Sequence, residues 1–266
     1  MTKKISILGG GNIGKAIARG LMRTGFYKPD SIIVTRRNTV LLDDLASEGI
    51  CVTSDNQFAI KNSGIIIVAV RPRQLENLLK EIKDVLRFET QILVSVVPAF
   101  SITEIEKIVG HRMKIIRAIP NIAITIQESM TCLSTNGYGT ENFKQVQDIF
   151  DHLGRTLVID ENLMSAATIL GACGIAYFLR IIRAASQGGI QIGFHAEEAQ
   201  LIAAQTAKGA SAMMIDSGNH PEKEIDRVTT PRGCTIAGLN EMEHHGLSSA
   251  LIQGIVTSYK EIEKLK

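Results

Sequence analysis

The sequence predicts an α/β fold in which a doubly wound parallel sheet is followed by an all-α C-terminal part. In the first half, short β-branched runs alternate with amphipathic segments, the pattern that crossover connections impose on a parallel sheet. From Glu161 onwards such runs almost disappear and Ala, Gln, Glu and Leu dominate, as is typical of helices. The chain has 266 residues, of which 45% are hydrophobic. This length suggests two domains, although one large α/β domain would also fit.

The expected strands are short, and those such as the run Ile65–Val68 are apolar without alternation, as in sheets that helices cover on both faces. They are Ile5–Leu8, Ile32–Thr35, Cys51–Thr53, Ile65–Val70, Ile92–Val96, Lys114–Ala118 and Met130–Ser134. Helices are expected between them at Ile13–Thr24, Leu75–Leu86 and Glu141–Leu153. In the second of these helices the apolar residues recur every three or four positions, which places them on one face.

The C-terminal part is expected to consist of helices. They are Asn162–Ile192, His195–Asp216, Glu222–Arg227, Thr235–His244 and Leu247–Lys264. The first carries small residues along its length, which lets another helix approach closely. About a hundred helical residues can hardly cover such a helix alone, so we expect a homodimer. Residues 1–160 are therefore expected to form one domain and residues 161–266 a second, helical domain that dimerises.

Composition excludes several classes of protein. Lys+Arg 29 and Asp+Glu 27 give a net charge of +2, so we expect neither a nucleic-acid nor a membrane partner. The four scattered cysteines form no CxxC pair and the histidines are mostly isolated, so no metal site is expected. The N-terminus does not resemble a signal peptide, and no uninterrupted apolar run reaches the ~20 residues of a membrane helix. We expect a cytoplasmic protein.

A nucleotide-binding motif follows the first expected strand. It is the GxGxxG run formed by Gly9, Gly11 and Gly14, with Asn12 and Ile13 opening the helix. The first glycine permits a tight turn, the second lets the backbone approach a pyrophosphate, and the third allows close helix–strand packing. The helix N-terminus adds free N–H groups for the phosphates. Strand, turn and helix fall where the motif requires, which predicts a Rossmann domain that binds a nicotinamide cofactor.

The end of the second strand indicates which cofactor this is. An acidic residue there would bind a free 2′-hydroxyl, but the chain has Thr35, Arg36 and Arg37 instead. Two guanidinium groups and a hydroxyl suit a 2′-phosphate. We therefore expect NADP(H), and NAD(H) stays open as a second cofactor. Arg71, after the Ile65–Val70 strand, is expected to line the same cleft.

A second group of polar residues lies in the run Val228–Leu239. It combines hydroxyl side chains, a proline-fixed turn and a glycine ahead of an expected helix. Such a turn can present hydroxyls and free N–H groups to a small carboxylate, or it can simply cap a helix. The residues alone leave both interpretations open.

The sequence resembles the pyrroline-5-carboxylate reductases, a family that makes L-proline, over nearly the whole chain. The matching segments, in the family's order, are Gly9–Gly14, Ala69–Pro72, Arg117–Asn121, Gly171–Tyr177 and Thr229–Thr235. The resemblance implies NAD(P)H-dependent reduction of 1-pyrroline-5-carboxylate, a cyclic imine, in the last step of proline biosynthesis. It also implies a dimer, which in this family can assemble further into a decamer.

The resemblance assigns roles to individual residues. Thr230 matches the substrate-binding hydroxyl and Thr235 the threonine near the imine nitrogen, so these two are the expected catalytic residues. We expect the N–H groups of Gly233 and Cys234 to join Thr230 at the substrate carboxylate. The positions that match contacts to the nicotinamide half of the cofactor are Asn56, Ala69, Val70, Arg71, Pro120 and Asn121.

The chain also departs from the family pattern. Arg232 replaces a glycine of the C-terminal turn, Arg71 stands where lysine is common, and Gly171–Ile175 replaces a Ser-Gly-Ser-Gly-Pro run. Two other functions stay open. One is a different NADP-dependent imine or hydroxyacid oxidoreductase, although a hydroxyacid dehydrogenase would be expected to carry a lysine within Asn162–Ile192, which has none. The other is a non-catalytic NADP-binding homologue.

Overall fold

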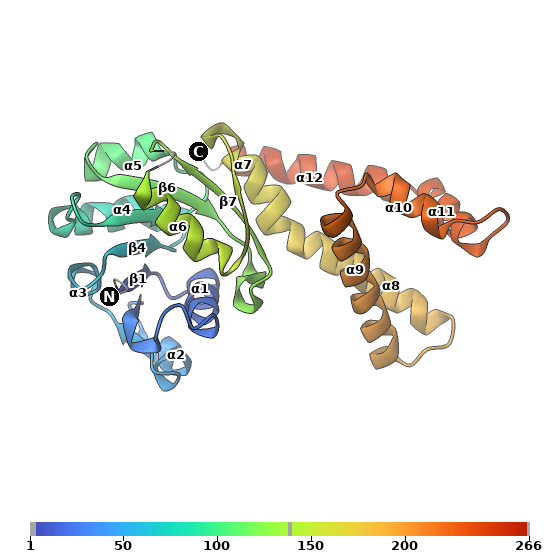
Figure 1. The fold of residues 1–266 in the computed structure, drawn as a ribbon, viewed down its shortest axis with the longest axis horizontal. Helices are drawn as coiled ribbons and strands as arrows, with labels where there is room; N and C mark the ends of the chain where they lie inside the picture. The colour runs from blue at the N-terminus through green and yellow to red at the C-terminus, as the bar shows by residue number, and fades with distance from the viewer. Residues whose placement is uncertain (1–3, 138–139, 265–266) are drawn as a thin grey trace. The chain divides into compact units, whose positions relative to one another are not determined.

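The computed structural model describes residues 4–137 and 140–264. By its internal contacts the chain divides into two compact units (Figure 1). The first unit contains the residues up to Cys173 together with those from Tyr259 onwards, and the second is Gly174–Ser258. The domain boundary at residue 160 rests on the change in sequence composition, and it stays a prediction.

The first unit is built on an eight-stranded sheet with the order β3-β2-β1-β4-β5-β6-β7-β8. The strands are β1 (Ile5–Leu8), β2 (Ile32–Thr35), β3 (Cys51–Thr53), β4 (Ile65–Val68), β5 (Ile92–Ser95), β6 (Lys114–Ile119), β7 (Ser129–Thr135) and β8 (Gly154–Val158). Strands β1 to β6 are parallel, β7 runs antiparallel to β6, and β8 is parallel to β7. The predicted doubly wound sheet is confirmed, and its strand order reverses between β1 and β4. Ligands of such sheets bind at the carboxyl ends of the strands beside this reversal.

Helices cover both faces of the sheet (Figure 1). The core on one face includes residues of α1 (Asn12–Arg23), α2 (Asp43–Ser47) and α6 (Glu141–Asp151). The core on the other face includes residues of α3 (Asn56–Lys61), α4 (Pro72–Ile82) and α5 (Ile102–Val109). Because both faces are buried, β1, β2, β4 and β5 are buried at every position, which explains why their sequences are apolar apart from Ser6, Thr35 and Ser95.

Strand β8 was not predicted. Its residues are half-buried or exposed, and only its last two, Leu157 and Val158, are apolar, so the strand carries little of the signal that marks the buried strands. It begins at Gly154, which has φ +144, and a Cβ atom there would lie 2.1 Å from the carbonyl oxygen of Ser129 on β7. A glycine is therefore required where β8 starts to pair with β7.

The helix expected over Asn162–Ile192 is present, with a change in its middle that the sequence did not predict. It consists of α7 (Met164–Ala167), a π-helical segment (Thr168–Cys173) and α8 (Gly174–Gln191). The other C-terminal helices are α9 (Ala196–Ser217), α10 (Pro221–Val228), α11 (Cys234–His244) and α12 (Leu247–Glu263). The prediction of an all-α C-terminal part is therefore confirmed.

One helix within the described residues, Glu161–Gln191, is long and apolar enough to cross a membrane. The expectation from the sequence concerned uninterrupted apolar runs, and this helix does not contain one of ~20 residues, because Ser165, Thr168 and Arg180 interrupt it. Length and composition are weak evidence for a membrane span, since a core helix of a soluble protein passes the same test. Only 22% of its most apolar window is buried within this chain.

Large apolar side chains are also exposed over the helices of the second unit. They include Phe178, Leu179, Leu201, Ile202 and Ile215. Monomeric proteins rarely expose so many large apolar residues on a few neighbouring helices, so this unit presents a surface suited to a partner.

Candidate active site

The glycine-rich turn lies at the carboxyl edge of the sheet, between β1 and α1. Gly9 has φ +113, and a Cβ atom there would lie 2.5 Å from the carbonyl oxygen of Ala69. A Cβ atom on Gly14 would lie 2.1 Å from the carbonyl oxygen of Gly9. At Gly11, by contrast, a Cβ atom would meet no atom within 4 Å. Gly9 and Gly14 therefore close the turn, while the backbone at Gly11 stays open to a ligand.

Helix α1 begins at Asn12, directly after this open glycine, and Asn12, Ile13 and Gly14 form its first turn. The N–H groups of a first turn have no partner within the helix, and they carry the positive end of the helix dipole. No acidic residue lies in the first turn of α1 to cancel this charge. The turn can therefore bind a phosphate group.

The residues after β2 are held by contacts with the same turn. Thr35 is 2% exposed and its hydroxyl donates to Oδ1 of Asn56 at 2.6 Å, so this hydroxyl faces the protein interior. Nη1 of Arg36 donates to the carbonyl oxygen of Gly10 at 2.7 Å, which fixes the half-buried guanidinium beside the glycine-rich turn. Arg37 is exposed, and its side chain has no ion pair or hydrogen bond with any described residue.

Three loops follow the carboxyl ends of β4, β5 and β6. The backbone N–H of Ala69 donates to Leu8 at 2.8 Å, and that of Val96 donates to Val68 at 3.0 Å, so the first two loops start in register with β1 and β4. Val70 is half-buried and Arg71 is exposed at the start of α4. Because β5 lies between β4 and β6, its loop lies between two loops that contain predicted cofactor contacts.

No residue of this middle loop is among the site residues predicted from the sequence. It runs from Val96 to Phe100 and includes Ala99, a non-glycine residue with φ +68. Its residues match no motif. The signal that finds it is the strand order, because β5 is the neighbour of β4, which borders the switch point.

The loop after β6 is tied down by hydrogen bonds. Asn121, directly after Pro120, is 6% exposed and caps the short 3-10 helix η4 (Ile122–Ile126) by accepting from the N–H of Ala123 at 3.0 Å. Its backbone N–H donates to Oγ of Ser129 at 3.0 Å, and its Nδ2 donates to the carbonyl oxygen of Gly171 at 3.1 Å. Both polar atoms of the Asn121 side chain are therefore used within the protein.

An ion pair supports the same edge of the sheet. Nη1 of Arg117 on β6 lies 3.1 Å from Oε1 of Glu161, and the Arg117 side chain is 6% exposed. The same Glu161 oxygen accepts from the N–H of Ile102 at the start of α5, at 2.6 Å. Burial lowers the pKa of Arg117, against the opposing effect of Glu161. A cavity of about 310 Å³ adjoins the pair.

The predicted substrate turn belongs to the second unit, whereas the predicted cofactor residues belong to the first. The N–H of Gly233 donates to the carbonyl oxygen of Thr230 at 2.9 Å, and a Cβ atom on Gly233 would lie 2.5 Å from Oγ1 of Thr230. Thr230, Cys234 and Thr235 are exposed, and no acidic residue lies in the first turn of α11. The turn therefore presents hydroxyls and helix N–H groups that can bind a small anion.

Arg232 in this turn has φ +62, the left-handed conformation that glycine adopts most easily. Its side chain is exposed and makes no hydrogen bond or ion pair with the described residues. The turn therefore keeps a glycine-like backbone while carrying an added positive charge.

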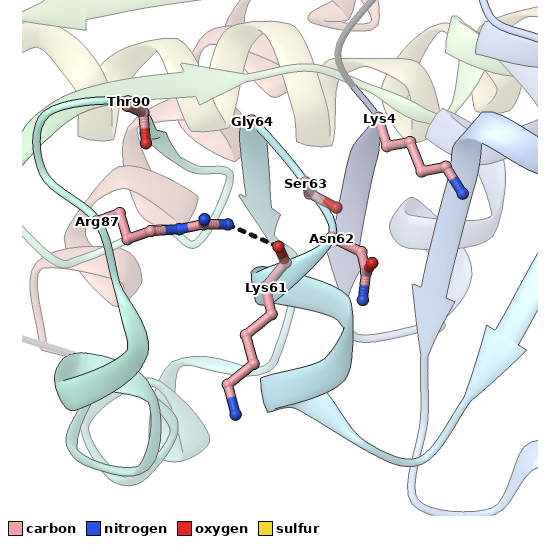
Figure 2. Close-up of a pocket in the computed structure, with 7 residues that line it drawn as sticks. All are labelled: Lys4, Lys61, Asn62, Ser63, Gly64, Arg87 and Thr90. Carbon is pink, nitrogen blue, oxygen red and sulfur yellow. Dashed lines mark hydrogen bonds between the residues drawn. The ribbon is translucent and has the colours of Figure 1, made fainter.

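A wider groove of about 480 Å³ lies at the opposite edge of the sheet (Figure 2). It is lined by Lys4, Lys61, Asn62, Ser63, Gly64, Arg87 and Thr90. Figure 2 shows Nη2 of Arg87 donating to the carbonyl oxygen of Lys61, at 2.6 Å. Lys4 and Gly64 precede β1 and β4, so the groove is at the amino-terminal edge, where doubly wound sheets do not bind their cofactors. Among the described residues, no group of three or more His, Cys, Asp or Glu side chains is placed to hold a metal.

Two family models match this chain. Residues 161–265 match the model described as "Pyrroline-5-carboxylate reductase dimerisation". Residues 4–99 match the model described as "NADP oxidoreductase coenzyme F420-dependent". The chain is 45% identical to pyrroline-5-carboxylate reductase 2 of Dictyostelium discoideum, over 98% of this chain and 93% of that one. It is 48% identical to reductase 1 of that organism over 96% of this chain, and spans 48% of that protein's length. The Arabidopsis thaliana enzyme is 31% identical, over 98% of this chain and 95% of that one.

Solved structures extend the likeness to three dimensions. A pyrroline-5-carboxylate reductase from Coxiella burnetii superposes with a TM-score of 0.88 at 27% identity, over 100% of this chain and 99% of that one. The enzyme from Streptococcus pyogenes gives 0.86 at 26% identity, over 99% of both chains. A Plasmodium falciparum pyrroline carboxylate reductase with NADP bound shares the fold, with a TM-score of 0.87 at 24% identity over 99% of this chain and 98% of that one.

Proposed function

We propose that this chain, which belongs to the pyrroline-5-carboxylate reductase family, reduces 1-pyrroline-5-carboxylate to L-proline with a nicotinamide cofactor. Members of this family are NAD(P)H-dependent oxidoreductases that act on a C=N bond. One observation carries the proposal: relatives named for this activity match the chain from end to end, so that the glycine-rich turn and the Thr229–Thr235 turn both fall inside the match.

The reaction places modest demands on the protein. A bound reduced nicotinamide supplies the hydride, and the imine carbon becomes electrophilic when its nitrogen is protonated. The side chains and backbone then have to bind the carboxylate of the ring, orient the imine carbon towards the cofactor and stabilise the charges of the carboxylate and of the protonated imine nitrogen. Positioning of this kind can supply several kcal/mol of barrier reduction.

The cofactor we propose is NADP(H), with NAD(H) as the second candidate. The pyrophosphate would contact the backbone of Gly9, Gly11 and Gly14 and the first N–H groups of α1, at Asn12 and Ile13. The open space at Gly11 and the uncancelled charge of this helix end support the contact. For the 2′-phosphate we propose Arg36 and Arg37, with Thr35 positioning them from within the core. The bond from Arg36 to Gly10 supports this role, since it fixes a guanidinium at the turn.

The nicotinamide half would lie along the loops after β4 and β6. Its proposed contacts are Asn56, Ala69, Val70, Arg71, Pro120 and Asn121. Support comes from the close packing of Ala69 on Gly9, which joins the β4 loop to the glycine-rich turn. Because both polar atoms of its side chain are used inside the protein, Asn121 would meet the cofactor through its backbone.

The substrate would be bound by the turn between α10 and α11. Thr230 and the N–H groups of Gly233 and Cys234 would hold the carboxylate, and the hydroxyl of Thr235 would bind the ring nitrogen. Their exposure and the N-terminal position of Cys234 and Thr235 in α11 support these roles. We propose Thr235 and Thr230 as the catalytic residues because both would touch the substrate.

We also propose that the protein is a cytoplasmic homodimer, with a decamer of dimers as a further candidate. The dimerisation family that matches residues 161–265 and the exposed apolar side chains of the second unit support the dimer. The four cysteines are all unpaired, as is usual in a reducing compartment.

The decisive experiment follows NADPH oxidation when 1-pyrroline-5-carboxylate is added, with L-proline identified as the product. Thr235→Ala should lower kcat/KM at least tenfold, because a hydrogen bond to a charged group contributes about 1.5–3 kcal/mol. Thr103→Ala is the matched control, since Thr103 is an exposed threonine on α5. A loss within threefold for Thr235→Ala would exclude its role. Oxidation of NADPH only with another carbonyl or imine would identify a different reductase, and NADPH binding without any turnover would indicate a non-catalytic homologue.

A further inference from the structure

The π-helical segment of the long helix is stabilised by two side chains. A π turn contains an extra residue, so the regular pairing of N–H and carbonyl groups is interrupted where it joins an α-helix. At the start of the segment, the hydroxyl of Thr168 donates to the carbonyl oxygen of Met164 at 2.8 Å. Further along, the donor comes from a different part of the chain: Nδ2 of Asn121 reaches the carbonyl oxygen of Gly171 at 3.1 Å. Asn121 therefore supplies a hydrogen bond to this segment from outside the helix.

This bond joins the segment to the loop that carries the proposed nicotinamide contacts. Asn121 immediately follows Pro120 at the carboxyl end of β6, and Ala172 of the π-helical segment packs against a buried cluster that contains Ile119, the last residue of β6. The segment is thus fixed against the carboxyl edge of the sheet both by an apolar contact and by a partly buried hydrogen bond.

The same loop is also packed against the helix of the glycine-rich turn. A Cβ atom on Gly20 of α1 would lie 2.5 Å from the carbonyl oxygen of Ile124 in η4, so the two backbones are in close contact. Nη1 of Arg23 on α1 donates to the carbonyl oxygen of Thr125 at 3.0 Å. Since Asn121 caps η4, its side chain lies in one continuous chain of contacts from the cofactor helix to the π-helical segment.

We propose that Asn121 is a positioning residue for imine reduction, which acts by fixing the π-helical segment through its bond to Gly171 rather than by a side-chain contact with the cofactor. The proposal rests on the proposed function, since it assumes that the loop after β6 flanks the nicotinamide. A segment fixed beside that loop keeps the reacting atoms in a productive arrangement, and a displacement of about 1 Å can cost a hundredfold in rate.

The test is Asn121→Asp, which keeps the size of the side chain and the oxygen that caps η4 but replaces the amide donor by an acceptor. We expect kcat with 1-pyrroline-5-carboxylate to fall at least tenfold at neutral pH, while the Kd of NADPH changes less than threefold. Asn62→Asp is the matched control. Asn62 also donates from Nδ2 to a backbone carbonyl, that of Phe58 at 2.8 Å, but it lines the amino-edge groove (Figure 2).

The pH profile of Asn121→Asp separates positioning from a general loss of structure. When the introduced carboxyl is protonated it regains a donor, so the ratio of wild-type to variant kcat should shrink as the pH falls towards 5. Cys132 on β7 and Cys173 in the π-helical segment are titratable neighbours, and burial raises the pKa of both thiols, so both stay neutral over this range.

Amide hydrogen exchange of residues 168–175 provides a measurement that does not depend on turnover. Exchange should become at least tenfold faster in Asn121→Asp and stay unchanged in Asn62→Asp. A variant that keeps wild-type kcat, or one whose π-helical segment exchanges as slowly as in the wild type, overturns the inference and leaves the proposed function intact. If the wild-type protein does not reduce the imine, the proposed function fails, and with it the assigned role of Asn121, whatever the exchange rates.

Discussion

Replacing Arg36 and Arg37 one at a time tests the proposed choice of cofactor. The two arginines are adjacent in sequence but differ in environment. Arg36 is half-buried, and one of its donors is fixed on the carbonyl oxygen of Gly10. Arg37 is exposed and free of partners among the described residues. The structure therefore predicts unequal contributions to binding of the 2′-phosphate.

The expected magnitudes follow from these environments. Arg36 keeps donors for the phosphate beyond the one held by Gly10, and a hydrogen bond to a charged group contributes about 1.5–3 kcal/mol. Arg36→Ala should therefore raise the Kd of NADPH by about 10- to 150-fold. The exposed charge of Arg37 is screened by water and contributes about 0.2–1 kcal/mol, so Arg37→Ala should raise this Kd by about 1.5- to 5-fold.

The assay is a titration of each variant with NADPH and with NADH. The chain contains no tryptophan, so the fluorescence of the bound dihydronicotinamide can be followed directly. NADH lacks the 2′-phosphate, and for Arg36→Ala its Kd should rise less than threefold. An equal rise for both cofactors would refute the reasoning, because it would show that Arg36 only supports the backbone at Gly10.

Three further predictions concern the glycine-rich turn, the buried ion pair and acid stability. Gly14→Ala should lower both the melting temperature and the affinity for NADPH, since the new Cβ atom would lie 2.1 Å from a backbone oxygen. Gly11→Ala places its Cβ atom in open space and should lower only the affinity. Calorimetry and titration with NADPH separate the two effects, and an equal fall in melting temperature for both variants would contradict this prediction. Glu161→Ala should lower the free energy of unfolding, measured in urea, by about 2–3 kcal/mol, which is less than for a fully buried pair because Glu161 is 31% exposed. A loss under about 1 kcal/mol would show that water replaces Glu161 as the partner of Arg117. The pKa of Asp44 is lowered to about 2, chiefly by a hydrogen bond from Lys15 of α1. The Asp44 carboxylate therefore stabilises the fold above about pH 4, and this stabilisation is lost as the pH falls towards 2. Solvent screening keeps it under about 1 kcal/mol, and Asp44→Asn should flatten the unfolding free energy across that window.

The sequence predicted the sheet well because its central strands are buried on both faces. Such strands are mostly apolar, so that Ile65–Val68, which is apolar throughout, and Ile5–Leu8, which is interrupted only by Ser6, can be recognised from this pattern. The half-exposed strand β8 lacks this signal, and what fixes it is the pairing of Gly154 with Ser129 on a distant strand. Long-range contacts of this kind leave no local pattern in the sequence.

The candidate site shows the same limit. The spacing of Gly9, Gly11 and Gly14 predicted a tight turn. The structure contains this turn, with Gly9 and Gly14 closing it and Gly11 open to a ligand. The direction of the Thr35 hydroxyl could not be predicted, because it depends on Asn56 from another crossover. Asn121 was identified through the family resemblance, but its bond to a π turn fifty residues away is visible only in three dimensions.

The altered run Gly171–Gly174 preserves what the π-helical segment requires. The carbonyl oxygen of Gly171 accepts the amide of Asn121, and Ala172 packs against the cluster of Ile119, Cys132 and Met164. Burial raises the pKa of Cys173, so its thiol stays neutral and behaves as a small apolar group. The segment therefore depends on backbone bonds and small volumes rather than on the serine hydroxyls of the family pattern. If substrate affinity differs from that of relatives with the family pattern, the difference should instead come from Arg232. This residue adds a positive charge to the exposed turn between Thr230 and Thr235, and it does so at a backbone conformation that glycine would adopt without strain.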